Sequence, residues 1–283
     1  CEDLHFVYEN ADGFQPFPTY AVSLLFKGDS ANVVPFPPAT INPPRQESSR
    51  WRLPTSRVQL HAEQLVRVLR PLPASPFEGH LRARLVGLHS KERFMLAETE
   101  YVISGPGNDG GSDVDYVSMI SAAAHVGVAA FAPDAGVTYA VAVPVPNEGP
   151  PDAVVDFRVA NNQHLVFRLS GDYNAIHIDP AAAAAAGLEA GQPILHGLCT
   201  YGIAARACLA TFAGGDGRRF RALKARMALP VLPGQTLRTE MWQDEHGGDG
   251  DGNSMRVLFQ TRCLETDAVV LSNAYFVYSR SID

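Results

Sequence analysis

Apolar and polar residues alternate along several segments of the chain, a pattern typical of half-buried antiparallel strands. The first half contains four such segments, at 57–72, 80–90, 93–104 and 113–124. The second half contains four more, at 220–231, 235–245, 254–265 and 268–279. The chain is therefore expected to form mainly antiparallel sheet, with strands grouped toward the end of each half.

Helical patterns interrupt this alternation at a few places. Apolar or small residues recur at helical spacing over 196–213, which predicts the longest helix of the chain. Residues 180–188 begin with Pro and carry Gly near the end, the arrangement expected of a short helix. Residues 18–26, PTYAVSLLF, fit either a short helix or a buried strand, because periodicity alone does not separate the two.

A Pro- and Gly-rich segment, residues 144–152, divides the chain near its middle. We expect two units, at 1–140 and 141–283. In the second unit one long helix precedes a run of antiparallel strands, which indicates an α+β fold with the sheet wrapped around the helix. Both halves also join two strands through a Pro-rich turn, a weak hint of duplication.

Composition narrows the class of protein. The chain has 283 residues, of which 46% are hydrophobic, enough for a substantial core. A formal net charge of −7 disfavours nucleic-acid binding. No apolar run approaches the ~18 residues of a membrane helix. The four cysteines form no CxxC pair and have no metal-like spacing with histidine, so we expect reduced thiols and no metal site.

The residues best suited to chemistry lie in one short segment, after an expected strand and before the Pro-started helix. Asp172, Asn174 and His177 fall within six positions, directly after a Ser-Gly turn. A carboxylate, a carboxamide and an imidazole can together supply a base, an acid and an orienting donor, as proton transfer beside a carbonyl requires. Any one of these residues alone is better explained as a turn former or a buried histidine. Their combination favours a catalytic interpretation.

His196 and Gly197 begin the predicted long helix. The first turn of a helix leaves backbone N–H groups without partners, and such groups can stabilise a developing oxyanion. Glycine at 197 would let a thioester oxygen approach the backbone closely. The two segments together therefore indicate an acid–base site facing an oxyanion site.

The segments SGDYNAIHIDP (170–180) and ILHGLCTYG (194–202) resemble the signature of the (R)-specific enoyl-CoA hydratases, the hydratase 2 or MaoC-like family. Shorter matches such as FVYE, LHAEQ, RPLP and KARMALPVLPGQTL extend the resemblance over essentially the whole chain. It implies a double hot-dog fold, in which each of two repeats is a helix wrapped by an antiparallel sheet. It also implies that the second repeat is catalytic, while a shortened helix in the first leaves space for a bulky acyl chain.

The resemblance also assigns roles to individual residues. It gives Asp172 and His177 as the catalytic pair and Asn174 as their motif asparagine. It places the oxyanion and substrate-binding positions at Gly197, His196 and Met227, and supporting acids at Glu63 and Asp179. Two positions depart from the family pattern: Phe167 stands where relatives often have Tyr, and Met227 stands where an aromatic residue is expected.

The expected function is hydration of trans-2-enoyl-CoA to (3R)-3-hydroxyacyl-CoA in fatty-acid β-oxidation. No metal or redox cofactor is expected, since coenzyme A belongs to the substrate. The resemblance further implies a homodimer, a peroxisomal location and a place within a larger multifunctional enzyme that carries a dehydrogenase domain. A thioesterase of the same fold and a non-catalytic acyl-CoA binding module remain as alternatives.

Overall fold

The computed structural model describes residues 3–27, 34, 36, 58–74, 76, 78–107, 112–128, 135–146, 149–188, 191–244 and 253–281. Ten strands of this part form a single sheet, and every strand pairing in it is antiparallel. None of the described helices is both long and apolar enough to cross a membrane.

The two halves of the chain contribute matching sets of strands. The first half supplies β1 (Val58–Val68), β2 (His80–Ser90), β3 (Phe94–Pro106), β4 (Asp113–Val126) and β5 (Ala135–Gly136). The second half supplies β6 (Ala153–Arg158), β7 (Phe220–Met227), β8 (Thr236–Asp244), β9 (Ser254–Cys263) and β10 (Ala268–Ser279). Their order is β5-β2-β3-β4-β1-β7-β10-β9-β8-β6, so the halves meet at β1 and β7. From there β1-β4-β3-β2 and β7-β10-β9-β8 follow in matching order, while the edge strands differ, because β5 ends the first half and β6 begins the second.

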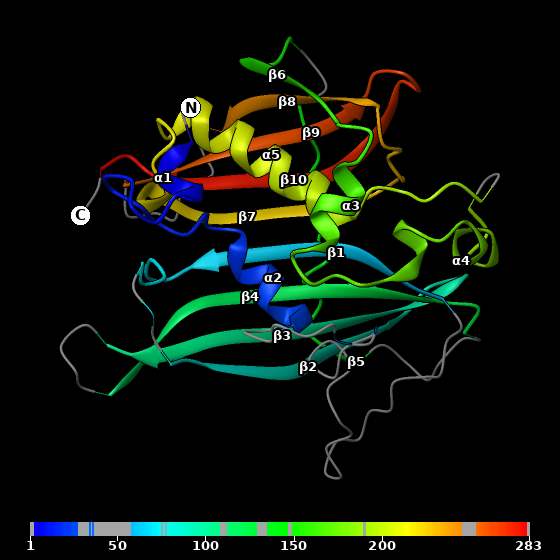
Figure 1. Ribbon diagram of the computed structural model, residues 1–283, viewed down its shortest axis with the longest axis horizontal. Helices are drawn as coiled ribbons and strands as arrows, with labels where there is room; N and C mark the ends of the chain where they lie inside the picture. Colours follow the sequence, from blue (N-terminus) through cyan, green and yellow to red (C-terminus); the bar gives the residue numbers. More distant parts are fainter. Residues whose placement is uncertain are drawn as a thin grey trace.

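The helices differ strongly in length between the halves. The first half has α1 (Leu4–Val7) and α2 (Tyr20–Lys27), while the second has α3 (Gln163–Arg168), α4 (Pro180–Ala185) and α5 (Gly197–Phe212). Short 3-10 turns, η1 (Ala175–His177) and η3 (Gly217–Arg219), precede α4 and β7. In Figure 1, α2 and α5 lie over the same face of the sheet, α2 over first-half strands and α5 over second-half strands.

One large apolar core joins both helices to the sheet. It contains Ala21 and Leu25 of α2, Tyr201 and Cys208 of α5, and inward-facing strand residues such as Phe276. Burial of these side chains is the main favourable contribution to folding. Each half is thus a helix packed against an antiparallel sheet, and the double hot-dog prediction is confirmed. The boundary at 140 and 141 stays a prediction.

The segment between the halves is bonded to the sheet through side chains. The buried Glu98 carboxylate accepts from the backbone N–H groups of Tyr139 and Ala140, at 2.9–3.1 Å. The Lys224 ammonium donates to the Val141 carbonyl at 2.7 Å. These contacts satisfy buried charges and fix the connection against strands of both halves.

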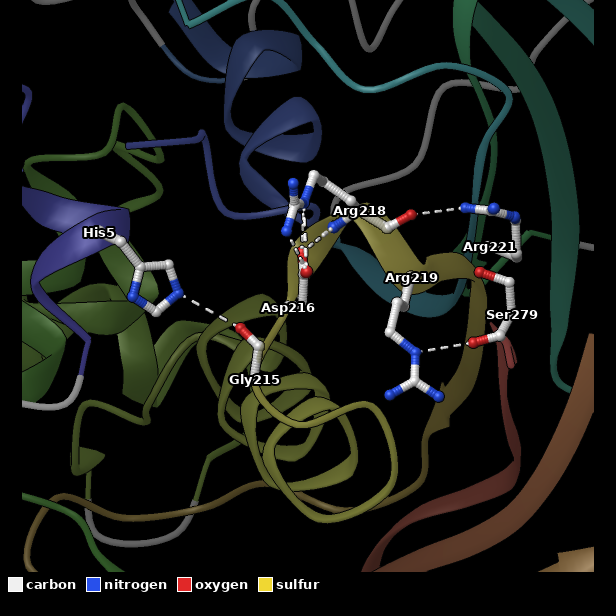
Figure 2. Close-up of polar contacts among 7 residues, drawn as sticks. All are labelled: His5, Gly215, Asp216, Arg218, Arg219, Arg221 and Ser279. Carbon is white, nitrogen blue, oxygen red and sulfur yellow. Dashed lines mark hydrogen bonds and ion pairs between the residues drawn. The ribbon is translucent and has the colours of Figure 1, made fainter. Parts of the chain in front are cut away.

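Polar contacts also anchor the far end of α5 (Figure 2). The His5 ring lies 3.2 Å from the Gly215 carbonyl oxygen, and Arg219 donates to the Ser279 carbonyl at 2.8 Å. Arg218 binds both carboxylate oxygens of Asp216. The loop after α5 is therefore tied to the N-terminal segment and to the end of β10.

Three sequence-based interpretations can now be settled. Residues 18–26 mostly belong to helix α2, so the open choice between helix and strand is decided. The expected strand before the catalytic segment is wrong, because Gln163–Arg168 forms helix α3. This segment has three apolar residues in six, and so short a segment does not distinguish a helix from a strand by its periodicity. Strand β6, at the edge of the sheet, was not expected as a separate element.

Candidate active site

The loop from α3 to α4 positions the acid–base residues. Gly171 adopts a φ of +112°, a conformation that side chains other than glycine's rarely tolerate, and it turns the chain into Asp172. Asp172 is 8% exposed and His177 is 6% exposed. The loop therefore holds a carboxylate and an imidazole inside the protein.

Asn174 organises this loop through its backbone and its side chain. Its backbone N–H donates to Asp172 Oδ1 at 3.2 Å. Its own Oδ1 accepts from the Ile176 N–H at 3.3 Å and caps η1, the turn that ends at His177. The asparagine thus links the positions of both catalytic candidates, as an N-cap residue typically fixes the start of a turn.

The tautomer of His177 follows from its hydrogen bond. Nδ1 lies 2.9 Å from the Ile194 carbonyl oxygen, which can only accept, so Nδ1 carries the hydrogen. In the neutral ring, Nε2 is then the hydrogen-bond acceptor. The partner is a backbone atom 17 residues away. No side-chain pattern in the sequence could have identified it.

Burial shifts both groups toward their neutral forms. It raises the pKa of Asp172 from its ordinary value near 3.8 to about 6, although the Asn174 N–H opposes the shift. It lowers the pKa of His177 from 6.5 to about 4. Near neutral pH the site therefore holds a carboxylate and a neutral imidazole, two groups that can each accept a proton.

A cavity of about 720 Å³ connects these groups to both halves of the chain. Asp172, Asn174 and His177 line it, together with Gly197 and Met227. The first half contributes apolar side chains from α2 and small residues from β4, among them Leu25, Phe26, Ala123 and Ala124. The arrangement suits a ligand whose reacting end is polar and whose remainder is apolar.

Gly197 begins α5, where the first backbone N–H groups have no partner within the helix. A Cβ atom at this position would lie 2.9 Å from Met227 Cγ. Glycine therefore keeps the helix start close to the flexible Met227 side chain at the cavity wall. An oxygen placed there would meet a backbone donor and the positive end of the helix dipole.

Comparisons with known proteins identify the family of the chain. A family model described as a MaoC like domain matches residues 143–267, which include every motif position above. A solved MaoC-like dehydratase from Phytophthora capsici shares 36% identity with a TM-score of 0.83, covering 99% of this chain and 88% of that one. The chain belongs to the MaoC-like dehydratase family.

Two curated relatives show where other members of the family occur. The "Peroxisomal multifunctional enzyme type 2" of Mus musculus is 37% identical over 97% of this chain, but the match spans only 33% of the mouse protein. The "Enoyl-CoA hydratase 2, peroxisomal" of Arabidopsis thaliana is 30% identical over 96% of this chain and 81% of its own length. This MaoC-like chain therefore corresponds to about one third of the mouse relative.

Glu63 lines the cavity of this MaoC-like chain but is already paired. Its Oε1 lies 3.2 Å from Lys224 Nζ, and both side chains are buried. Because β1 and β7 are the strands at which the two halves meet, this ion pair joins the halves across the seam of the sheet. Burial raises the pKa of Glu63 to about 7, and Lys224 opposes the rise. A supporting role in the reaction stays a prediction.

Two residues expected at the site lie elsewhere. Asp179 is exposed, and its side chain accepts from the Ala181 N–H at 2.9 Å as the N-cap of α4. His196 is 1% exposed and stacks on the His177 ring behind the cavity wall. Neither is among the described residues that line the cavity. The roles expected for both residues stay predictions, and their burial and direction depend on the packing of α4 and α5, which the sequence pattern does not give.

Asp172, His177 and His196 also form a group that merits comparison with metal sites, since their ligand atoms lie within 4.8 Å of one another. The two imidazole rings are stacked, with centroids 3.7 Å apart and planes 24° from parallel. Stacked rings direct their nitrogens side by side, whereas tetrahedral zinc requires ligands converging at ~2.0–2.1 Å. The geometry therefore favours proton transfer over metal ligation, and the expectation of no metal stays a prediction.

Proposed function

We propose that this chain hydrates trans-2-enoyl-CoA to (3R)-3-hydroxyacyl-CoA, as a step of fatty-acid β-oxidation. The observation that carries the proposal is the pairing of Asp172 and His177 at one end of an apolar cavity, beside the N-terminus of α5. The names of the mouse and Arabidopsis relatives support the same reaction.

The mechanism follows from the protonation states. With the Asp172 pKa near 6 and the His177 pKa near 4, both groups are unprotonated at neutral pH. One water held between them loses a proton to one of them as its oxygen attacks C3. The same proton then returns to C2, so the product gains one water in total. Because the titrations of the two groups are coupled, the identity of the first acceptor is left open.

The negative charge that develops on the thioester oxygen during attack would be stabilised by the Gly197 N–H at the start of α5. Asp172 and His177 both face the cavity from the loop between α3 and α4, so the hydroxyl and the proton reach the same face of the double bond. Addition is therefore syn. No step of this scheme uses a metal or a redox cofactor, and coenzyme A takes part only as the substrate's carrier.

A thioesterase would need water directed at the carbonyl carbon rather than at C3. A thioesterase could use the same acid–base pair and the same Gly197 N–H group, but its product would be free CoA and a carboxylic acid. The two activities are therefore distinguished by their products. A non-catalytic acyl-CoA binding module would need the cavity alone. The buried, desolvated carboxylate at Asp172 argues against it, because such a group costs stability and is typical of catalytic sites.

Assembly and location extend the proposal. We propose a homodimer and a peroxisomal location, and that the activity operates within a larger multifunctional enzyme alongside a dehydrogenase domain. The mouse relative is named as a multifunctional peroxisomal enzyme and is about three times as long as the matched region. We propose no nucleic-acid or membrane partner, because the net charge of −7 disfavours binding to phosphate-rich surfaces.

The test is an assay of crotonyl-CoA and decenoyl-CoA that follows two products at once. Loss of the conjugated thioester absorbance reports hydration, and a thiol reagent reports release of free CoA. The proposal expects hydration without thiol release. Thiol release at the same rate would instead identify a thioesterase, and tight binding without either product would identify a binding module.

A further inference from the structure

His196 occupies the N-cap position of α5, directly before Gly197, yet its side chain does not cap the helix. The imidazole instead turns inward and stacks on the His177 ring, with centroids 3.7 Å apart. On another side it meets the Phe167 ring at 4.8 Å. The ring is thus enclosed by aromatic neighbours and touches the catalytic histidine directly.

A second contact joins His196 to the other catalytic residue. Its Nε2 lies 3.3 Å from the backbone carbonyl oxygen of Asp172. A carbonyl only accepts, so Nε2 carries the hydrogen and Nδ1 carries the lone pair. Among the described residues, Nδ1 is buried without a hydrogen-bond partner. One side chain therefore contacts both members of the acid–base pair while leaving one of its own polar atoms unsatisfied.

We propose that His196 is a positioning residue, which fixes the Asp172 backbone and the His177 ring relative to each other and remains neutral throughout turnover. The role rests on the proposed hydratase function, because it concerns the acid–base pair of that reaction. The described residues that line the cavity do not include His196, so the proposal places its ring behind His177 rather than against the substrate.

The surroundings explain why the ring stays neutral. The charged and titratable groups around it are His177 and Asp172 in the motif loop, and His164 and Arg168 on α3. Burial, followed by the neighbouring His177, lowers the pKa of His196 to about 2. A neutral aromatic ring can lie against His177 when that residue transiently gains a proton, whereas a second cation at 3.7 Å would oppose the proton transfer.

The unsatisfied Nδ1 separates this role from simple core filling. A buried polar atom without a partner destabilises a protein. If His196 only filled space, a phenylalanine at this position would cause little loss of stability or activity. Phenylalanine can stack on His177 but cannot donate to the Asp172 carbonyl. Glutamine can donate but cannot stack. The pair of substitutions therefore tests the two contacts separately.

The first experiment uses the unmodified protein and needs no substrate. Nitrogen-15 NMR of histidine side chains, titrated from pH 5 to pH 8, reports which ring nitrogen of each histidine carries a hydrogen. The proposal expects His196 as a neutral Nε2–H tautomer that does not titrate in this range. Titration of His196 between pH 5 and pH 8, or the opposite tautomer, overturns it even if the hydratase proposal is correct.

The second experiment compares His196→Phe and His196→Gln with Cys199→Ala, which trims a buried side chain on the same turn of α5 outside the cavity. A small displacement of a reacting group can lower the rate by up to ~100-fold, so each His196 variant is expected to lose roughly ten- to a hundredfold in kcat with KM within about threefold. The Cys199 variant should keep its kcat. Normal kcat in both His196 variants contradicts the proposal, as does an equal loss in Cys199→Ala.

Discussion

The two halves of the chain share one strand arrangement and use it differently. In the second half, α5 runs for 16 residues and its first turn closes one end of the cavity. In the first half, α2 has only 8 residues, and Leu25 and Phe26 near its end form part of the cavity wall. The longer helix positions the chemistry, and the shorter one leaves room for a substrate.

The buried charged residues of the two halves also differ, in the partners that they have. In the second half, Asp172 and His177 face the cavity without an ion-pair partner among the described residues. In the first half, Glu98 is held by the backbone of residues 139 and 140, and Glu63 by Lys224. The paired carboxylates hold the connecting segment and the seam between the halves, whereas Asp172 has no such partner and can exchange a proton with a substrate.

The largest expected effect is the loss of turnover when the acid–base pair is changed. Asp172→Asn and His177→Gln should each lower kcat by ~10²–10⁴-fold, the usual contribution of a positioned acid or base. The exposed ion-pair residue Asp156 provides a control, because Asp156→Asn lies outside the cavity lining and should keep full activity. Steady-state kinetics with crotonyl-CoA measures all three.

The stability of Asp172→Asn sharpens this prediction. Because burial raises the folded-state pKa of Asp172 to about 6, the ionised form costs the folded protein free energy at pH 7, and the cost disappears as the pH falls toward 4. Asparagine carries no such cost at any pH. The variant should therefore melt at the same or a higher temperature at pH 7. Near-normal kcat with unchanged melting would show that Asp172 is not part of the reaction.

Compared with an exposed ion pair, the buried pair between the halves should contribute more to stability. Lys224→Met removes the cation beside Glu63, whose pKa is already raised to about 7, so Glu63 becomes protonated. The Val141 carbonyl also loses its donor, and the free energy of unfolding should fall by ~1–3 kcal/mol. Adding Glu63→Gln should recover part of that loss. Arg238→Met, which breaks the exposed pair with Asp156, should cost at most ~1 kcal/mol. Urea denaturation measures each, and equal losses for the buried and exposed pairs would contradict the assigned roles.

The space left by the short α2 can be filled by mutation. Ala123 of β4 lines the cavity, so Ala123→Phe should exclude about two methylenes of a long acyl chain, worth ~0.8 kcal/mol each. The kcat/KM for decenoyl-CoA should fall roughly tenfold, while that for crotonyl-CoA changes by less than about twofold. A series from four to sixteen carbons tests the wild type. If kcat/KM is greatest at four carbons and falls steadily with length, the first half does not house the acyl chain.

The smallest effect concerns Asp179. As the N-cap of α4, Asp179→Ala should lower the free energy of unfolding by ~1 kcal/mol, and Asp179→Asn by almost nothing, with kcat retained in both. Thermal unfolding and kinetics together decide the role. A tenfold fall in kcat for Asp179→Asn at unchanged stability would show that Asp179 also takes part in the reaction.

The fold was largely predictable because its signals are local. Alternation identified eight strands, and helical spacing identified α5. Helix α3 was misread because three apolar residues in a six-residue segment do not define a period. The hydrogen-bond and ion-pair partners of Glu63 and His177 could not be predicted from the sequence, for a different reason. Lys224 comes beside Glu63 only through the β1–β7 register, and His177 bonds a backbone carbonyl.

The motif predicted which residue types form the site, but it did not predict which way their side chains point. Asp172, His177 and Gly197 meet at the cavity as expected. The family resemblance placed His196 among the substrate-binding positions, and the structure shows its ring stacked on His177. Spacing along the chain specifies which side chains are near, whereas burial decides which of them a substrate can reach.

We propose that one cavity delivers water and a proton to the same face of an enoyl thioester. Hydration of trans-2-decenoyl-CoA in D₂O, followed by chiral and NMR analysis of the product, decides whether it does. We expect the (3R) alcohol with deuterium at C2 added syn to the hydroxyl group. A (3S) product, or deuterium added to the opposite face, would show that Asp172 and His177 do not act from one side of the substrate.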